Sequence, residues 1–99
     1  MSDFDYQYKS FAQSCEERAI ALNAEIRKLN IRVLHCDKEL QRAQTFADTL
    51  DCYDGEEAIE YWLAEGIIAE ENRRILWNEF KSLDDDYYSI LGKHLRMEF

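Results

Sequence analysis

Residues 19–50 read AIALNAEIRKLNIRVLHCDKELQRAQTFADTL and contain neither glycine nor proline. Apolar side chains recur there every seven residues in two series, which are offset from each other by three residues. The first series is Ala19, Ile26, Val33, Leu40 and Ala47, and the second is Leu22, Leu29, Cys36, Ala43 and Leu50. This spacing is typical of a helix that packs against another helix along its length. The sequence therefore predicts a long amphipathic, coiled-coil-like helix, and we call these ten positions the seam.

The remainder of the composition also favours helices. The chain of 99 residues has no proline and only three glycines, and 46% of its residues are hydrophobic. Helix interiors exclude proline and penalise glycine, whereas a β-rich protein of this size needs more turn residues. We expect one all-α domain over residues 1–99, built as a bundle of three or four helices.

The length of the first helix leaves two arrangements open. A helix from about residue 10 to about residue 50 would extend roughly 60 Å, whereas a compact domain of 100 residues has a radius of gyration of only about 13 Å. We therefore expect the helix to break near Asn30 or Asp37, or the molecule to be elongated and to associate with itself. Ile20, Ile31 and Leu34 lie off the seam and widen the apolar face, as in a bundle. The seam can then pack against a helix of the same chain or form a coiled-coil homodimer.

The second half of the chain carries further helix signals. Asp54 and Glu57 form a capping box that predicts a helix start near Gly55, and Gly66 occupies the place of a C-terminal glycine cap. The acidic run 84–86 predicts another break. Between these signals, a buried helix side is expected at Ile68, Leu76, Phe80 and Leu83, and Trp62 is expected in the core.

Motifs for enzymatic or metal chemistry are missing from the sequence. It has no nucleophile elbow, phosphate-binding loop or C-x-x-C pair, and a calcium-loop alignment on Gly55 fails at its ligand positions. His35 and Cys36 are adjacent and would point about 100° apart on a helix, which separates them as metal ligands. We therefore expect a protein that is not an enzyme, with no cofactor and no metal, and a buried Cys36 that acts as a small hydrophobe.

The cysteines and the apolar runs bear on location. Three cysteines are an odd number, which fits a reducing compartment better than a disulfide framework. The N-terminal residues are acidic and lack the pattern of a secretory signal, and no apolar run reaches the roughly 20 residues that span a bilayer. The sequence predicts a cytoplasmic protein without membrane contact.

Negative charge is concentrated in the second half. The net charge is −9; residues 1–50 carry eight acids and seven bases, whereas residues 51–99 carry thirteen acids and five bases. Phosphate contacts need a basic surface, so this balance argues against direct nucleic-acid binding and indicates a basic protein partner. Residues 48–66 (DTLDCYDGEEAIEYWLAEG) contain seven acids and no Lys or Arg.

Part of this acidic stretch has a purely structural explanation, because Glu56 and Glu57 lie in a first helical turn, where the helix dipole favours acids. Asp48, Asp51, Glu60 and Glu65 have no cation nearby in the sequence. Tyrosine is a residue type that anchors protein interfaces. The predicted partner-binding residues are Asp48, Asp51, Tyr53, Glu56, Glu60, Tyr61 and Glu65.

These features lead to two functional hypotheses. In the first, the chain inhibits or sequesters a basic, nucleic-acid-handling protein, because acids on successive helical turns lie about 5–6 Å apart and can mimic a row of phosphates. In character, though in no single motif, such a protein resembles the inhibitors that phages and mobile elements direct against host nucleases or CRISPR complexes. In the second, it is a structural or adaptor coiled-coil homodimer that assembles through the Ala19–Leu50 seam.

Overall fold

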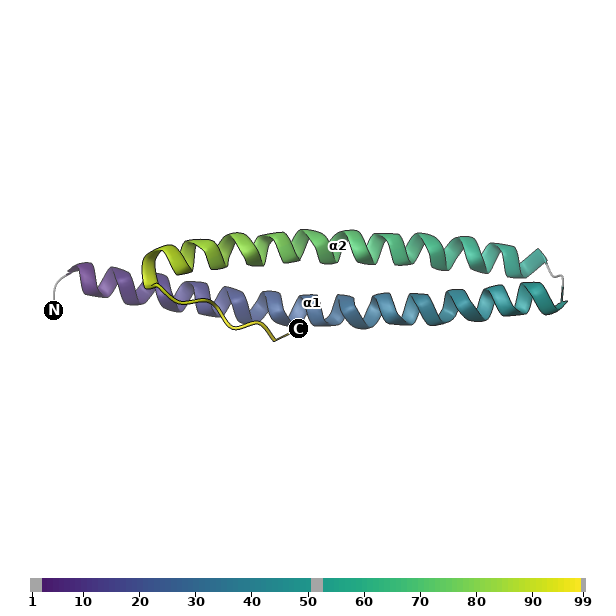
Figure 1. Ribbon diagram of the computed structural model, residues 1–99, viewed down its shortest axis with the longest axis horizontal. Coiled ribbons are helices and arrows are strands. Elements are labelled where there is room, and N and C mark those ends of the chain that lie inside the picture. Colours follow the sequence, from purple (N-terminus) through teal and green to yellow (C-terminus); the bar gives the residue numbers. More distant parts are fainter. Residues whose placement is uncertain (1–2, 51–52, 99) are drawn as a thin grey trace. The chain divides into compact units, whose positions relative to one another are not determined.

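The computed structural model describes residues 3–50 and 53–98, with side chains for residues 7–46 and 55–98. Two helices, α1 (Asp3–Leu50) and α2 (Tyr53–Leu91), form an all-α helical hairpin (Figure 1). The all-α class and the long first helix are confirmed. The expectation of three or four helices is wrong, because the described residues form two. Over these residues, neither helix has an apolar stretch sufficient to cross a membrane.

Three helix ends predicted from local signals do not occur in the described residues. Helix α1 runs without interruption through Asn30 and Asp37, and α2 runs through Gly66 and through residues 84–86. A glycine inside a helix costs only about 1 kcal/mol relative to alanine. The packing of one continuous apolar face outweighs this cost, and it explains why two long helices replace several short ones.

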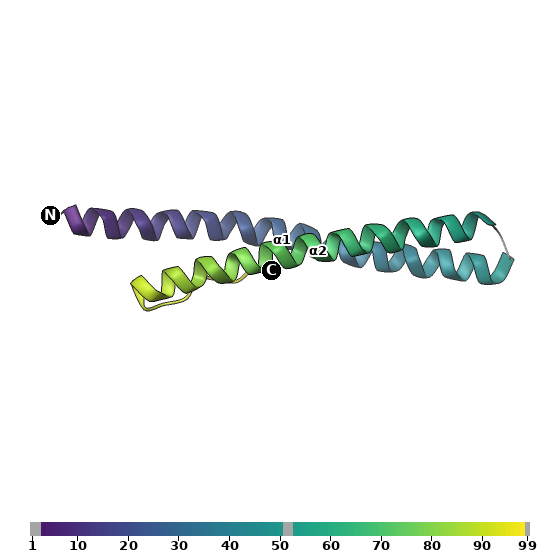
Figure 2. The same ribbon diagram turned by 90° about the horizontal axis from the view of Figure 1, so that it is seen from above.

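Contacts divide the chain into two units. Unit 1 comprises Met1–Arg27 and Ile75–Phe99, and unit 2 comprises Lys28–Arg74. In each unit, one stretch of α1 and one stretch of α2 lie side by side and run in opposite directions (Figures 1 and 2). The seam positions from Ala19 to Ala43 therefore pack against α2 of the same chain within their unit, whereas Ala47 and Leu50 lie outside the described side chains.

The core of unit 1 follows the apolar spacing of α1. Its buried residues are Cys15, Ala19, Leu22 and Ile26 from α1, Phe80 and Tyr87 from α2, and Leu95 from the segment after α2. The steps of four, three and four residues in α1 keep these side chains on one face. The predicted core position of Phe80 is confirmed, and Leu76 and Leu83 pack against this cluster as partly buried neighbours.

Helix α2 ends in a glycine turn that reverses the chain. Gly92 has a positive φ of 69°, and its N–H donates a hydrogen bond to the carbonyl of Tyr88 at 2.8 Å. This is the left-handed conformation that glycine adopts most readily at a helix C-terminus. The backbone N–H of Leu95 then donates to Oδ1 of Asp84 at 2.6 Å, so an acid of the predicted break holds the segment that follows α2.

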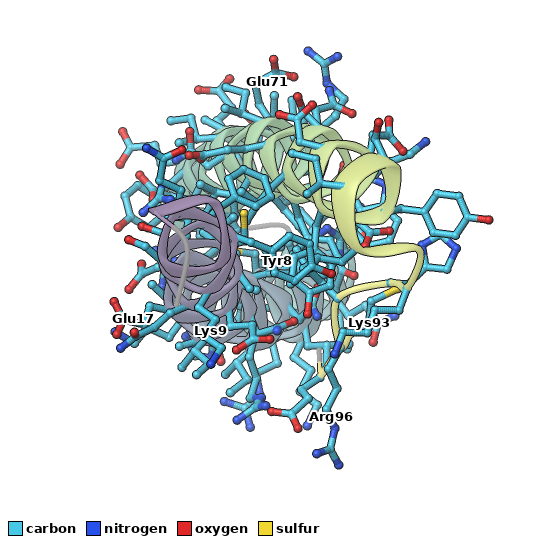
Figure 3. All side chains as sticks on the ribbon, turned by 90° about the vertical axis from the view of Figure 1, so that its left-hand side faces the viewer. Tyr8, Lys9, Glu17, Glu71, Lys93 and Arg96 are labelled. Carbon is cyan, nitrogen blue, oxygen red and sulfur yellow. The ribbon has the colours of Figure 1, made fainter. Side chains whose placement is uncertain are left out.

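The segment after α2, residues 93–98, is held against α1 by a buried asparagine. Asn23 donates from Nδ2 to the carbonyl of Arg96 at 2.9 Å and accepts at Oδ1 from the N–H of Glu98 at 3.0 Å. Both polar ends of this side chain are thus paired, as a buried amide requires. Figure 3 shows the Arg96 side chain pointing outwards from this segment, as Lys9 and Glu17 do from α1.

The buried phenol of Tyr87 gives unit 1 a predicted pH dependence. Burial, together with the hydrogen bond that its hydroxyl donates to Oε1 of Glu16 at 2.8 Å, raises the pKa of Tyr87 from 10.0 to about 12. The unfolded chain therefore loses this proton first, and stability should fall as the pH rises from 10.0 to about 12. We expect the urea midpoint of the wild type to fall more steeply over this range than that of Tyr87→Phe.

The exposed neighbour Tyr88 supplies the control for this measurement. Tyr88→Phe removes the same hydroxyl group from a side chain that is half exposed, so it is the matched substitution for Tyr87→Phe. Equal slopes for the wild type and Tyr87→Phe would contradict the assignment of this pH dependence to Tyr87.

Unit 2 is packed around smaller residues. Its buried positions are Val33, Cys36 and Ala43 in α1 and Gly55 and Ala69 in α2. The burial predicted for Cys36 is confirmed, and its thiol is free. Two other expectations are corrected: Trp62 is only partly buried, and Ile68 is exposed. Ile68 is exposed because the face of α2 continues through Gly66, which turns Ile68 away from α1.

Substitutions at Gly66 and Gly92 test where α2 continues and where it ends. A Cβ at Gly66 would lie at an ordinary van der Waals distance, 3.6 Å, from Cβ of Cys36. We expect Gly66→Ala to raise the free energy of unfolding by about 0.5–1 kcal/mol, measured by chemical denaturation. Gly92→Ala should lower it by about 1–2 kcal/mol, because of the left-handed backbone. Destabilisation by Gly66→Ala would instead support a helix end at this glycine.

Candidate protein-binding surface

The structure describes four of the seven predicted partner-binding side chains. Three lie outside the described side chains: Asp48, Asp51 and Tyr53. The other four belong to α2: Glu56, Glu60, Tyr61 and Glu65. All four of these are in unit 2, so their arrangement follows from the geometry of one helix.

These four side chains do not share one face of α2. A helix advances by about 100° per residue, so Glu56 and Glu60 lie about 40° apart, as do Tyr61 and Glu65. By the same geometry, Glu56 and Glu65 lie on opposite sides of the helix. The sequence stretch that looked like one acidic block therefore supplies two separate surfaces.

The surface that contains Glu65 is neutralised by α1. Nη2 of Arg32 lies 3.1 Å from Oε2 of Glu65 in an ion pair, and the hydrogen bond that Arg32 donates to Glu65 raises the pKa of Arg32 above its usual value. The expectation that Glu65 lacks a cation is wrong, since the cation comes from the other helix. This pairing across the helices removes Glu65 as a free charge for a partner.

Aromatic contacts complete this surface around Trp62. The guanidinium carbon of Arg32 lies 5.5 Å from the centre of the Trp62 ring. The rings of His35 and Tyr61 meet Trp62 edge to face, with centroid distances of 5.3 and 4.9 Å. Tyr61 remains exposed, so it is free to contact a partner, although its position is set by contacts within the protein.

A shallow groove lies beside Trp62 in unit 2. It has a volume of about 310 Å³ and is lined by Glu39, Arg42, Ala43, Phe46, Gly55, Ala58 and Trp62. Its two charged residues pair with each other, since Nη1 of Arg42 lies 3.2 Å from Oε1 of Glu39. This internal pairing leaves the groove without an unpaired charged group to direct a ligand.

Glu56 and Glu60 keep the unpaired charge that the sequence indicated. Both are exposed, and neither forms an ion pair with another residue among the described side chains. Like charges four residues apart on a helix repel by about 0.2–0.5 kcal/mol. A cation from a partner would relieve this repulsion, which makes these two acids the part of the predicted site best suited to binding.

Sequence reasoning missed the apolar side chains beside these acids. Leu63 and Ile67 follow Glu60 on the same side of α2, and both are exposed, as is Leu34 of α1. If α2 is one helix, Trp62, Gly66 and Ala69 lie on the side that faces α1, and the same helical spacing places Leu63 and Ile67 on an outer side.

Comparison of the chain with protein-family models, curated proteins and solved structures gave no match.

Proposed function

We propose that this chain is a small, acidic, non-enzymatic binding protein that inhibits or sequesters a basic protein, one that handles nucleic acids. The observation that carries the proposal is the pair Glu56 and Glu60, exposed on successive turns of α2 and unpaired among the described residues. Their spacing of about 5–6 Å is comparable with that of phosphates along a nucleic-acid strand. The net charge of −9 would speed the encounter with such a partner.

The packing of α1 bears on the alternative, a homodimer through the Ala19–Leu50 seam. Ile26, Val33 and Cys36 of this seam are buried, each in a unit where α1 packs against α2 of the same chain. A second copy could reach these side chains only if the two helices separated. We therefore favour a monomeric hairpin that offers its outer surfaces to the partner. The free buried thiols of Cys15 and Cys36 suit the cytoplasmic location that we propose.

A charge-reversal experiment tests this function. Tagged wild-type protein and Glu56→Lys/Glu60→Lys would be used to capture proteins from a cell lysate at about 50 mM and about 500 mM salt. We expect the wild type to retain a basic protein at low salt and to lose most of it at high salt. The double variant should retain at least tenfold less, because two attractions become repulsions.

The matched control reverses two exposed acids of unit 1. Glu17→Lys/Asp85→Lys changes the net charge by the same amount and should capture the partner much as the wild type does. Capture of no basic protein by the wild type, or equal losses for both double variants, would contradict the proposed function of this surface.

A further inference from the structure

Unit 2 has two flanks, and the residues on either side of the seam define them. In α1, residues one place before a seam position face the first flank, and in α2 we count in the same way from the residues that face α1, such as Trp62 and Gly66. Arg32 precedes Val33, Glu65 precedes Gly66, and this pair bridges the helices. Residues one place after a seam position face the second flank. Asn30, which follows Leu29, accepts a hydrogen bond from Nη1 of Arg73 at 3.1 Å on this second side.

The second flank carries large apolar side chains together with acids. By the same rule, Leu34 follows Val33, Leu63 follows Trp62 and Ile67 follows Gly66; their exposed fractions are 63%, 50% and 60%. Asp37 follows Cys36, and Glu60 and Glu70 lie on the same side of α2. Arg74 also lies on this side, but it is paired with Glu71. We call this set the acidic flank: Leu34, Asp37, Glu60, Leu63, Ile67 and Glu70.

The spacing along α2 fits a third helix. Glu56, Glu60, Leu63, Ile67 and Glu70 follow one another in steps of four, three, four and three residues. This is the repeat that lets one helix pack along another, and the seam of the hairpin uses the same repeat. This side of α2 therefore presents a second helix-packing row, with Leu63 and Ile67 at its apolar centre and the acids of the acidic flank, Glu60 and Glu70, next to them on either side.

The charges of the acidic flank select the kind of helix that can cover it. Asp37, Glu60 and Glu70 form no ion pair with another residue among the described side chains. A second copy of this chain would bring a net charge of −9 against them, and like charges across an interface disfavour such a complex. A helix with an apolar stripe between lysines or arginines would bury the leucines and isoleucine and pair with all three acids.

We propose that the acidic flank binds an amphipathic helix with basic margins, presented by the partner protein. Apolar side chains of that helix pack against Leu34, Leu63 and Ile67, while its basic side chains pair with Asp37, Glu60 and Glu70. This inference rests on the proposed function, the binding of a basic protein, and identifies the surface and the partner segment that would perform it.

A synthetic peptide tests the surface with the full-length protein. The probe is a fluorescently labelled 21-residue peptide of about three heptads, with leucine at the a and d positions and lysine at the flanking positions. The two control peptides are a scrambled peptide of the same composition and oligolysine. We expect fluorescence anisotropy to show at least tenfold tighter binding of the amphipathic peptide than of either control.

Adjacent isoleucines supply matched variants of the protein. Ile67→Asp, on the acidic flank, should weaken peptide binding at least tenfold, whereas Ile68→Asp, at a 54% exposed side chain on the other side of α2, should leave it within twofold. Both variants should remain as helical as the wild type by circular dichroism. Equal effects of the two substitutions, or equal binding of all three peptides, would overturn the proposal.

Two further results separate this proposal from others. A dimer of the wild type in light scattering that Ile67→Asp dissociates and Ile68→Asp does not would assign the flank to a second copy, and would also overturn the proposal. If Ile67→Asp still captures the basic protein of the lysate experiment as the wild type does, the proposed function holds and the acidic flank is wrong. Failure of the wild type to capture any basic protein would instead remove the proposed function itself.

Discussion

Phe80→Ala is expected to lower the free energy of unfolding by about 3–5 kcal/mol. The Phe80 side chain is 2% exposed, lies in the core of unit 1 and stacks on Trp77 with a centroid distance of 6.2 Å. Removing the ring loses the transfer free energy of a large apolar side chain and leaves a cavity in the packed core. Guanidinium denaturation followed by tryptophan fluorescence measures the change.

Ile75→Ala is the control for this substitution. Ile75 also lies on the unit 1 part of α2, but its side chain is 54% exposed, so its truncation should change stability by no more than about 0.5 kcal/mol. Similar losses for the two variants would show that α2 does not present Phe80 inwards.

Val33→Asp should have an effect of comparable size on unit 2. The Val33 side chain is 7% exposed on the seam, so an aspartate there would take a carboxylate out of water in place of an apolar side chain. An unpaired buried charge costs on the order of 4 kcal/mol, and the lost apolar burial adds to that cost. We expect a marked loss of the helical signal at 222 nm and a lower denaturation midpoint.

Leu34→Asp tests the same chemistry one residue further along α1. The Leu34 side chain is 63% exposed, so this variant should fold with nearly wild-type stability while losing affinity for the amphipathic peptide. The pair therefore separates the seam from the acidic flank. Comparable destabilisation by both variants would contradict the assignment of Leu34 to an outer surface.

The seam could be predicted from the sequence because its cause is local. Helical geometry brings residues three and four apart onto one face, so an unbroken apolar repeat identifies the buried side of α1 without knowledge of what covers it. Leu22, Ile26 and Cys36 are accordingly among the most buried side chains.

The number of helices could not be predicted in the same way. Gly66 and the acids 84–86 resemble helix ends, but each such signal changes the free energy of the helix by only about 1 kcal/mol. The packing of the apolar face along α2 outweighs this local preference. Asp84 illustrates this, because its carboxylate is used by the N–H of Leu95 beyond the end of α2.

The candidate site was predicted only in part, because pairing across helices is not local. Arg32 and Glu65 are 33 residues apart in the sequence, so no short-range spacing could reveal that Glu65 is neutralised. Glu56 and Glu60 retain their unpaired charge because no cation among the described side chains bonds to them. Leu63 and Ile67 lie on opposite sides of Gly66 in the sequence. They can be placed on one side of α2 only because the helix continues through this glycine.

Closure of the hairpin within one chain is tested most directly by a disulfide between the two helices. A Cβ at position 66 lies 3.6 Å from Cβ of Cys36, inside the range of about 3.5–4.5 Å found in disulfides. Gly66→Cys, in a chain that also carries Cys15→Ala and Cys52→Ala, should oxidise to a monomer at a rate that does not depend on protein concentration. A disulfide-linked dimer whose yield rises with protein concentration would contradict the hairpin and favour assembly through the seam.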